Sequence, residues 1–167
     1  QVFNVSMMLH FIIAVCACIL LCSFSYLFFD KIINIPIERL YAAKVVYYSM
    51  VFSVVITVLS VPYDAVINSH ENMLYYSIVG IIDSFGKLTI AVYITTFVSG
   101  DKLIVYGILM AALSIAVMMA MQIYCHKHYP ECVFKPVTYF SKKKMKQMAS
   151  FASWKLSTQF TSMVGNY

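Results

Sequence analysis

The stretch "GIIDSFGKLTIAVYI", residues 80–94, places Asp83 and Lys87 four positions apart inside an otherwise apolar run. This run covers residues 74–97, and a helix of about 20 residues spans the hydrocarbon of a bilayer. Both side chains therefore fall near the middle of a predicted span, where each charge costs about 2.5 to 3.5 kcal/mol. We expect neither of them to face lipid.

The spacing of four puts Asp83 and Lys87 on one helix face, together with Tyr76, Gly80 and Ser84. One interpretation is a structural pair, in which the two charges neutralise each other and tolerate burial. The other is a functional cavity, in which Asp83 binds H⁺ or Na⁺ as a coupling ion and Lys87 holds an anionic substrate such as a phosphate. The residues alone leave both interpretations open.

Lys44 is the third candidate for a cavity or coupling-ion site, about one turn into another apolar run. Its long side chain can instead extend to the membrane interface, as lysines near helix ends commonly do. The chain contains no P-loop, no GxSxG elbow and no HExxH pair. We therefore expect no enzyme, no catalytic residue and no cofactor beyond a coupling H⁺ or Na⁺.

The composition indicates a membrane protein, because 62% of the 167 residues are hydrophobic and only 11% are charged, against about 25% charged in soluble domains. The strands of a membrane β-barrel are about half the length of these apolar runs. We therefore predict an all-α integral membrane protein, a multi-span helical bundle. Its expected spans are residues 5–29, 40–62, 74–97 and 103–124.

A fifth apolar segment, residues 148–167, is interrupted by the end of the sequence, and the first residue is Gln1 instead of Met. We expect the chain to be an internal fragment of a longer protein. The rest of that protein is then one of its partners.

The orientation follows from a basic connector, residues 125–147, which holds six of the twelve Lys and Arg residues. Basic loops tend to stay on the cytoplasmic side, so we predict that this connector is cytoplasmic. Counting back along the chain then places "SGDK" outside, "YDAVINSHEN" inside and "DKIINIPIER" outside. Because spans flank the connector, we expect contact with lipid headgroups and no binding to nucleic acid.

The run "CHKHYPEC", residues 125–132, gathers two Cys and two His. Its spacing matches no strong zinc pattern, and a reducing cytoplasm disfavours a disulfide. We expect a solvated loop without a metal.

Several longer segments of the sequence resemble those of a known protein family. "VFNVSMMLHF", "IPIERLYAAKVVYYS", "VPYDAVINSHENMLYYS" and "FASWKLSTQF" resemble bacterial transporters of the MOP superfamily. The nearest branch is similar to the polysaccharide flippases and MATE-like exporters that are labelled lipopolysaccharide or polysaccharide biosynthesis proteins. The resemblance runs in order through essentially the whole chain.

The resemblance implies a transporter of about twelve or more spans, built as two lobes that alternate access around a central site. Residues 1–124 would belong to the first lobe, residues 125–147 would be the cytoplasmic connector between the lobes, and residues 148–167 would begin the second lobe. The location implied is the bacterial cytoplasmic membrane.

The implied function is the movement of a polyprenyl-diphosphate-linked oligosaccharide across that membrane. The alternative is an H⁺- or Na⁺-coupled antiporter that exports drugs or metabolites. A third possibility, from another class, is a structural or signalling subunit without transport. No site motif of the family aligns with this sequence, so Asp83 and Lys87 rest on the burial argument alone.

Overall fold

The computed structural model describes residues 2–29 and 36–132 and, beyond these, residues 146, 147, 150, 154, 158 and 161. Most of the predicted connector and of the predicted fifth span lies outside the described residues, so both stay predictions. The described part is helical and contains no strand. Its helices are α1 (Val2–Leu27), α2 (Ile37–Ser69), α3 (Met73–Phe97), α4 (Lys102–His128) and the short 3-10 helix η2 (Pro130–Cys132).

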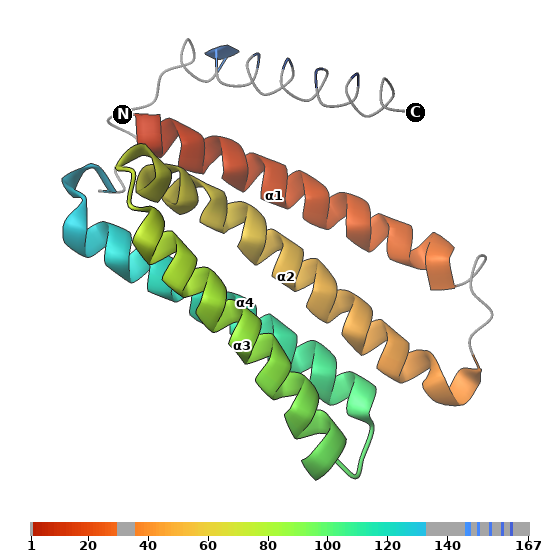
Figure 1. Cartoon of the computed structure of the whole chain (residues 1–167). Coiled ribbons are helices and arrows are strands. Elements are labelled where there is room, and N and C mark those ends of the chain that lie inside the picture. The colour runs from red at the N-terminus through yellow and green to blue at the C-terminus, as the bar shows by residue number, and fades with distance from the viewer. Residues whose placement is uncertain are drawn as a thin grey trace.

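Each of the four α-helices is long and apolar enough to cross a membrane. This confirms the prediction of an all-helical fold with four membrane-length segments in the described part of the chain. Figure 1 shows α1 lying along α2; α4 packs on α2, and α3 packs mainly on α4, with less contact to α2. Large apolar side chains remain exposed along all four helices, as expected for surfaces that face lipid.

Helix α2 is longer than the sequence predicts. We expected the second span to end at Pro62, but α2 continues to Ser69. A proline inside a helix costs about 3 kcal/mol because it lacks an N–H and its ring crowds the preceding turn. Here Tyr63, Val66 and Ile67 follow at helical spacing and are all buried, so packing of this face outweighs the cost.

The turn between α2 and α3 is set by two residues with turn chemistry. Glu71 takes a left-handed backbone conformation, φ 54°, which ends the preceding helical geometry. The side chain of Asn72 then accepts a hydrogen bond from the backbone N–H of Tyr75 at 3.3 Å. An asparagine in this role caps the N-terminus of α3.

Helices α2 and α4 approach each other closely at Gly107. A Cβ added to this buried glycine would lie 3.2 Å from the Cα of Val46 and 3.4 Å from the Cβ of Ser49. Small residues at such a crossing allow two backbones to come together, which is how helices commonly pack inside membranes.

The main buried cluster lies at one end of the bundle, where the start of α1 meets the end of α2, the start of α3 and the end of α4. Its members are Phe3, Tyr63, Val66, Ile67, Val79, Met121, Cys125 and Cys132. In the predicted orientation this is the cytoplasmic end.

Candidate functional site

Asp83 and Lys87 form an ion pair on α3. The Nζ of Lys87 donates a hydrogen bond to Oδ2 of Asp83 at 2.7 Å, as their spacing of one helical turn predicts. The side chain of Lys87 is 52% exposed and that of Asp83 is 28% exposed. The pair is therefore made within α3, and the other described helices do not enclose it.

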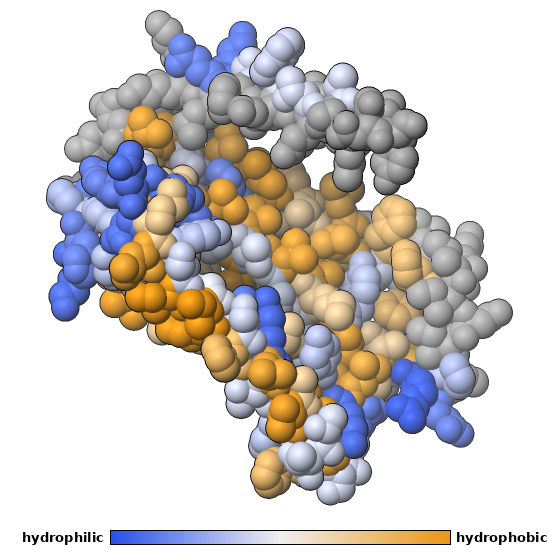
Figure 2. All heavy atoms as spheres, in the orientation of Figure 1, coloured by the Kyte–Doolittle hydropathy of each residue, from blue (hydrophilic) through white to orange (hydrophobic). Residues whose placement is uncertain are grey.

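The surface around this pair is open. The hydroxyl of Ser84 donates to the backbone carbonyl of Gly80 at 2.9 Å, and a Cβ added to Gly80 would meet no atom of the described residues within 4 Å. Figure 2 shows a hydrophilic patch between hydrophobic side chains over the middle of α3. The other described helices leave this polar face (Gly80, Asp83, Ser84 and Lys87) uncovered, as a cavity lining or a contact surface for another helix requires.

Lys44 lies elsewhere. It is exposed near the start of α2, and its Nζ stands 5.9 Å from the centre of the Phe29 ring. An ammonium over an aromatic face is a favourable cation–π contact. Within the described residues no contact joins Lys44 to Asp83 or Lys87, so the three candidates do not form one site in this part of the chain.

The structure corrects our prediction that "CHKHYPEC", residues 125–132, is a solvated loop: its two cysteines are buried. His126, Lys127 and His128 are exposed, but Cys125 is fully buried and Cys132 is 1% exposed. The reason is that α4 continues through His128, which keeps Cys125 on its buried face, and η2 folds Cys132 back into the core. The Sγ of Cys125 donates to the backbone carbonyl of Tyr63 at 3.8 Å.

The Cys132 thiol lies outside the membrane-length helices, and its surroundings favour the protonated form. Burial raises the pKa of Cys132; a hydrogen bond from Cys125 lowers it in part, and the nearby Glu131 carboxylate raises it further. A protonated thiol is a weak nucleophile and does not ligate metals. In the part of the chain that the structure describes, no three His, Cys, Asp or Glu side chains are placed to hold a metal ion.

A group that the sequence analysis missed ties the α2–α3 turn to the end of α4. The side-chain amide of Asn72 donates to the hydroxyls of Tyr124 at 2.7 Å and Tyr129 at 3.2 Å. The rings of Tyr75 and Tyr124 stack with centroids 3.6 Å apart. His70 stacks on Tyr129 at 4.2 Å. The only available sequence signal was Asn72 itself, as an N-cap; its tyrosine partners lie more than fifty positions away.

The same group reaches η2. The Nε2 of His70 hydrogen-bonds the carboxylate of Glu131, so the turn is fastened to the first residues of the predicted connector. We name Asn72, Tyr75, Tyr124, Tyr129, His70 and Glu131 the turn clamp.

We expect Asn72→Ala to destabilise the protein by about 1 to 2 kcal/mol, because it removes the N-cap of α3 and both tyrosine hydrogen bonds. Thermal unfolding in detergent, followed by circular dichroism, measures this loss. Asn68→Ala is the matched control, since Asn68 is an exposed asparagine near the end of α2. Equal unfolding temperatures for the two variants would show that the turn clamp contributes nothing.

An apolar pocket of about 560 Å³ opens between α1, α2 and α4. Met7, Met8 and Met118 supply flexible thioethers to its wall, and Gln122 and His126 supply polar groups. A largely apolar wall with a few polar groups is typical of sites for small molecules, and methionine adapts to ligands of varied shape.

No protein-family model, no curated protein and no solved structure matches this chain. The family resemblance described above therefore stays a prediction.

Proposed function

We propose that this chain is part of a transporter, not an enzyme, that moves a polyprenyl-diphosphate-linked oligosaccharide across the bacterial cytoplasmic membrane by alternating access. The observation that carries this proposal is the Asp83–Lys87 ion pair, which lies in the middle of a membrane-length helix on a face that the other described helices leave open.

The energetic argument begins with the exposure of this pair. A charged group at the bilayer centre costs about 2.5 to 3.5 kcal/mol, and an ion pair that remains half exposed to lipid recovers only part of that cost. A water-filled cavity or a polar partner helix beside the Asp83–Lys87 pair would lower this cost. In transporters built from repeated halves, the substrate site lies near the midplane between those halves.

The pair also has spare hydrogen-bonding capacity. A lysine ammonium has three N–H donors, of which Asp83 takes one. The remaining donors of Lys87 can bind a diphosphate as it passes, while Asp83 keeps the lysine charged and oriented. Asp83 can in turn exchange its lysine partner for H⁺ or Na⁺ during the cycle. In this scheme Lys44 attracts the diphosphate near the membrane interface.

The second candidate function is an H⁺- or Na⁺-coupled antiporter for drugs or metabolites. The methionine-lined pocket between α1, α2 and α4 favours it, because this pocket suits apolar small molecules better than a sugar diphosphate. In that scheme Asp83 is the coupling-ion site.

The two functions are separated by deleting the gene in its natural host. The proposal predicts that lipid-linked oligosaccharide accumulates on the inner leaflet, at unchanged sensitivity to cationic drugs, and that the intact gene restores export. Drug sensitivity with normal glycan would support the antiporter instead. Normal glycan and normal drug resistance would reject both.

A further inference from the structure

Helix α2 carries a row of polar side chains along the edge of its contact with α4. The row, which we name the α2 stripe, repeats at helical spacing and consists of Ser49, Ser53, Thr57, Ser60 and Asp64. Ser49 fixes its direction, because the Cβ of Ser49 would lie 3.4 Å from a Cβ built on Gly107 of α4. The α2 stripe therefore runs beside α4 through the middle of a membrane-length helix.

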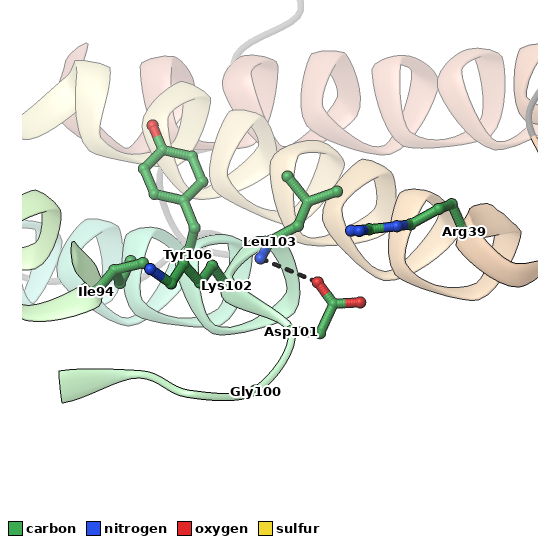
Figure 3. A pocket seen from close by; sticks show the side chains of 7 residues that line it. All are labelled: Arg39, Ile94, Gly100, Asp101, Lys102, Leu103 and Tyr106. Atoms are coloured by element: carbon green, nitrogen blue, oxygen red, sulfur yellow. Dashed lines mark hydrogen bonds between the residues drawn. The ribbon is translucent and has the colours of Figure 1, made fainter. Parts of the chain in front are cut away.

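The polar face of α3 is turned toward α2. Gly80, Lys87 and Ile94 are spaced by seven residues, which is two helical turns, so they share one side of α3. Ile94 lines a pocket of about 680 Å³ together with Arg39 of α2 and Tyr106 of α4, and Figure 3 shows these side chains around it. The side of α3 that bears the ion pair thus faces the space between α3 and α2.

This space is a groove with α4 as its floor. Helix α3 packs mainly on α4 and makes less contact with α2, and Figure 1 shows α2 and α3 spreading apart from their shared turn. Thr57, Gly80 and Lys87 are exposed, so no described side chain fills the space between the two helices.

The two ends of the groove differ. Near the turn, Ile67 of α2, Val79 of α3 and Met121 of α4 are buried in one cluster, which closes that end. The opposite end opens into the pocket of about 680 Å³, where α2 and α4 begin. In Figure 3 the Arg39 guanidinium and the Lys102 ammonium point away from each other. These cations therefore make the mouth polar without forming one anion site.

The groups along the groove favour water as its content. Asp64 lies one turn before the closing cluster, is half-buried, and makes no ion pair or hydrogen bond with another described residue. A carboxylate without a partner is costly in apolar surroundings. The hydroxyls of Ser53 and Thr57 donate to backbone carbonyls one turn earlier, at 3.0 and 2.9 Å. Their oxygen lone pairs remain available as acceptors for water.

We propose that the groove between α2 and α3 is filled with water and connects the Asp83–Lys87 pair and Asp64 to the side of the membrane on which α2 begins. The described conformation is open on that side and closed at the turn clamp. In the predicted orientation the open side is the outside. Only the assignment of this path to a transport cycle rests on the proposed function, since alternating access requires such a one-sided opening to the midplane.

The test measures how fast a charged, membrane-impermeant methanethiosulfonate modifies cysteines introduced one at a time into the full-length protein in sealed membrane vesicles. Peptide mass spectrometry reads the modification at each position. Ser53→Cys and Gly80→Cys place a thiol in the groove, and a Cβ at Gly80 meets no atom of the described residues within 4 Å. Val54→Cys and Ile81→Cys are the matched controls at the same depth, because Val54 and Ile81 are exposed apolar residues of α2 and α3.

Reagent added on the side where α2 begins should modify the groove cysteines at least about tenfold faster than the controls, because the reactive thiolate forms in water and not in lipid. Reagent added on the other side should modify groove and control cysteines equally slowly. Vesicles of both orientations provide the two directions of access, and rates are compared at equal amounts of inserted protein.

Equal rates for groove and control cysteines on both sides would overturn the proposal, since another helix or lipid would then cover the polar face. Fast modification of the groove cysteines from both sides would also overturn it, because the turn clamp would not close the path. The gene deletion tests the substrate separately. One-sided labelling with normal glycan export would reject the proposed substrate and keep the groove, whereas trapped glycan with unlabelled groove cysteines would reject the groove alone.

Discussion

Gly107→Leu is expected to separate α2 from α4 and to leave little folded protein. The added side chain would begin 3.2 Å from the Cα of Val46, and a backbone atom cannot move aside as a flexible side chain can. Overpacking costs typically about 1 to 3 kcal/mol, and contact with a facing backbone places this site at the upper end. The measurement is the denaturant midpoint at which helical circular dichroism is lost for protein in detergent micelles.

Two other glycines of the same chain provide graded controls. A Cβ at Gly86 would meet the Cδ1 of Leu113 at 2.7 Å, which is the far end of a side chain that can rotate, whereas at Gly80 it would meet nothing within 4 Å in the part of the chain that the structure describes. We therefore expect the loss of stability to fall in the order Gly107→Leu, Gly86→Leu, Gly80→Leu. If Gly80→Leu were as damaging as Gly107→Leu, close packing of α2 on α4 would not be the cause.

The second large effect is expected at the ion pair. Lys87→Met should abolish transport and also lower the amount of inserted protein, because it leaves the Asp83 carboxylate without its partner near the bilayer centre. Such an uncompensated charge costs about 2.5 to 3.5 kcal/mol. Transport of the substrate identified by the deletion experiment and the protein level in the membrane are measured together, so that activity is compared at equal amounts.

The charge swap Asp83→Lys/Lys87→Asp distinguishes a structural pair from a functional one. It keeps an ion pair on the same helix face, so we expect the protein level to recover. If the pair binds substrate or ion, transport should stay lost, because the ammonium and the carboxylate have exchanged positions. Recovered transport would mean that the pair serves folding alone, and the function proposed for Lys87 would be wrong.

The length and the apolar character of a helical span are properties of neighbouring residues, so the sequence by itself predicted four membrane-length helices. The pairing of Asp83 with Lys87 was equally predictable, since residues four apart share a helix face. The end of α2 was not, because the cost of Pro62 is local while the burial of Tyr63 and Ile67 that outweighs it comes from other helices.

The missed features have the same physical cause. The sequence predicted Cys125 and Cys132 to lie in a solvated loop, but the fold buries them beside Tyr63. Asn72 meets Tyr124 only because α4 returns along α3. Arg39 and Lys102 likewise share a pocket through helix packing alone. The sequence by itself thus determined which segments are helices able to cross a membrane and which charges lie within them. Only the tertiary structure decided which side chains are buried and which distant groups form sites, because both depend on contacts between residues far apart along the chain.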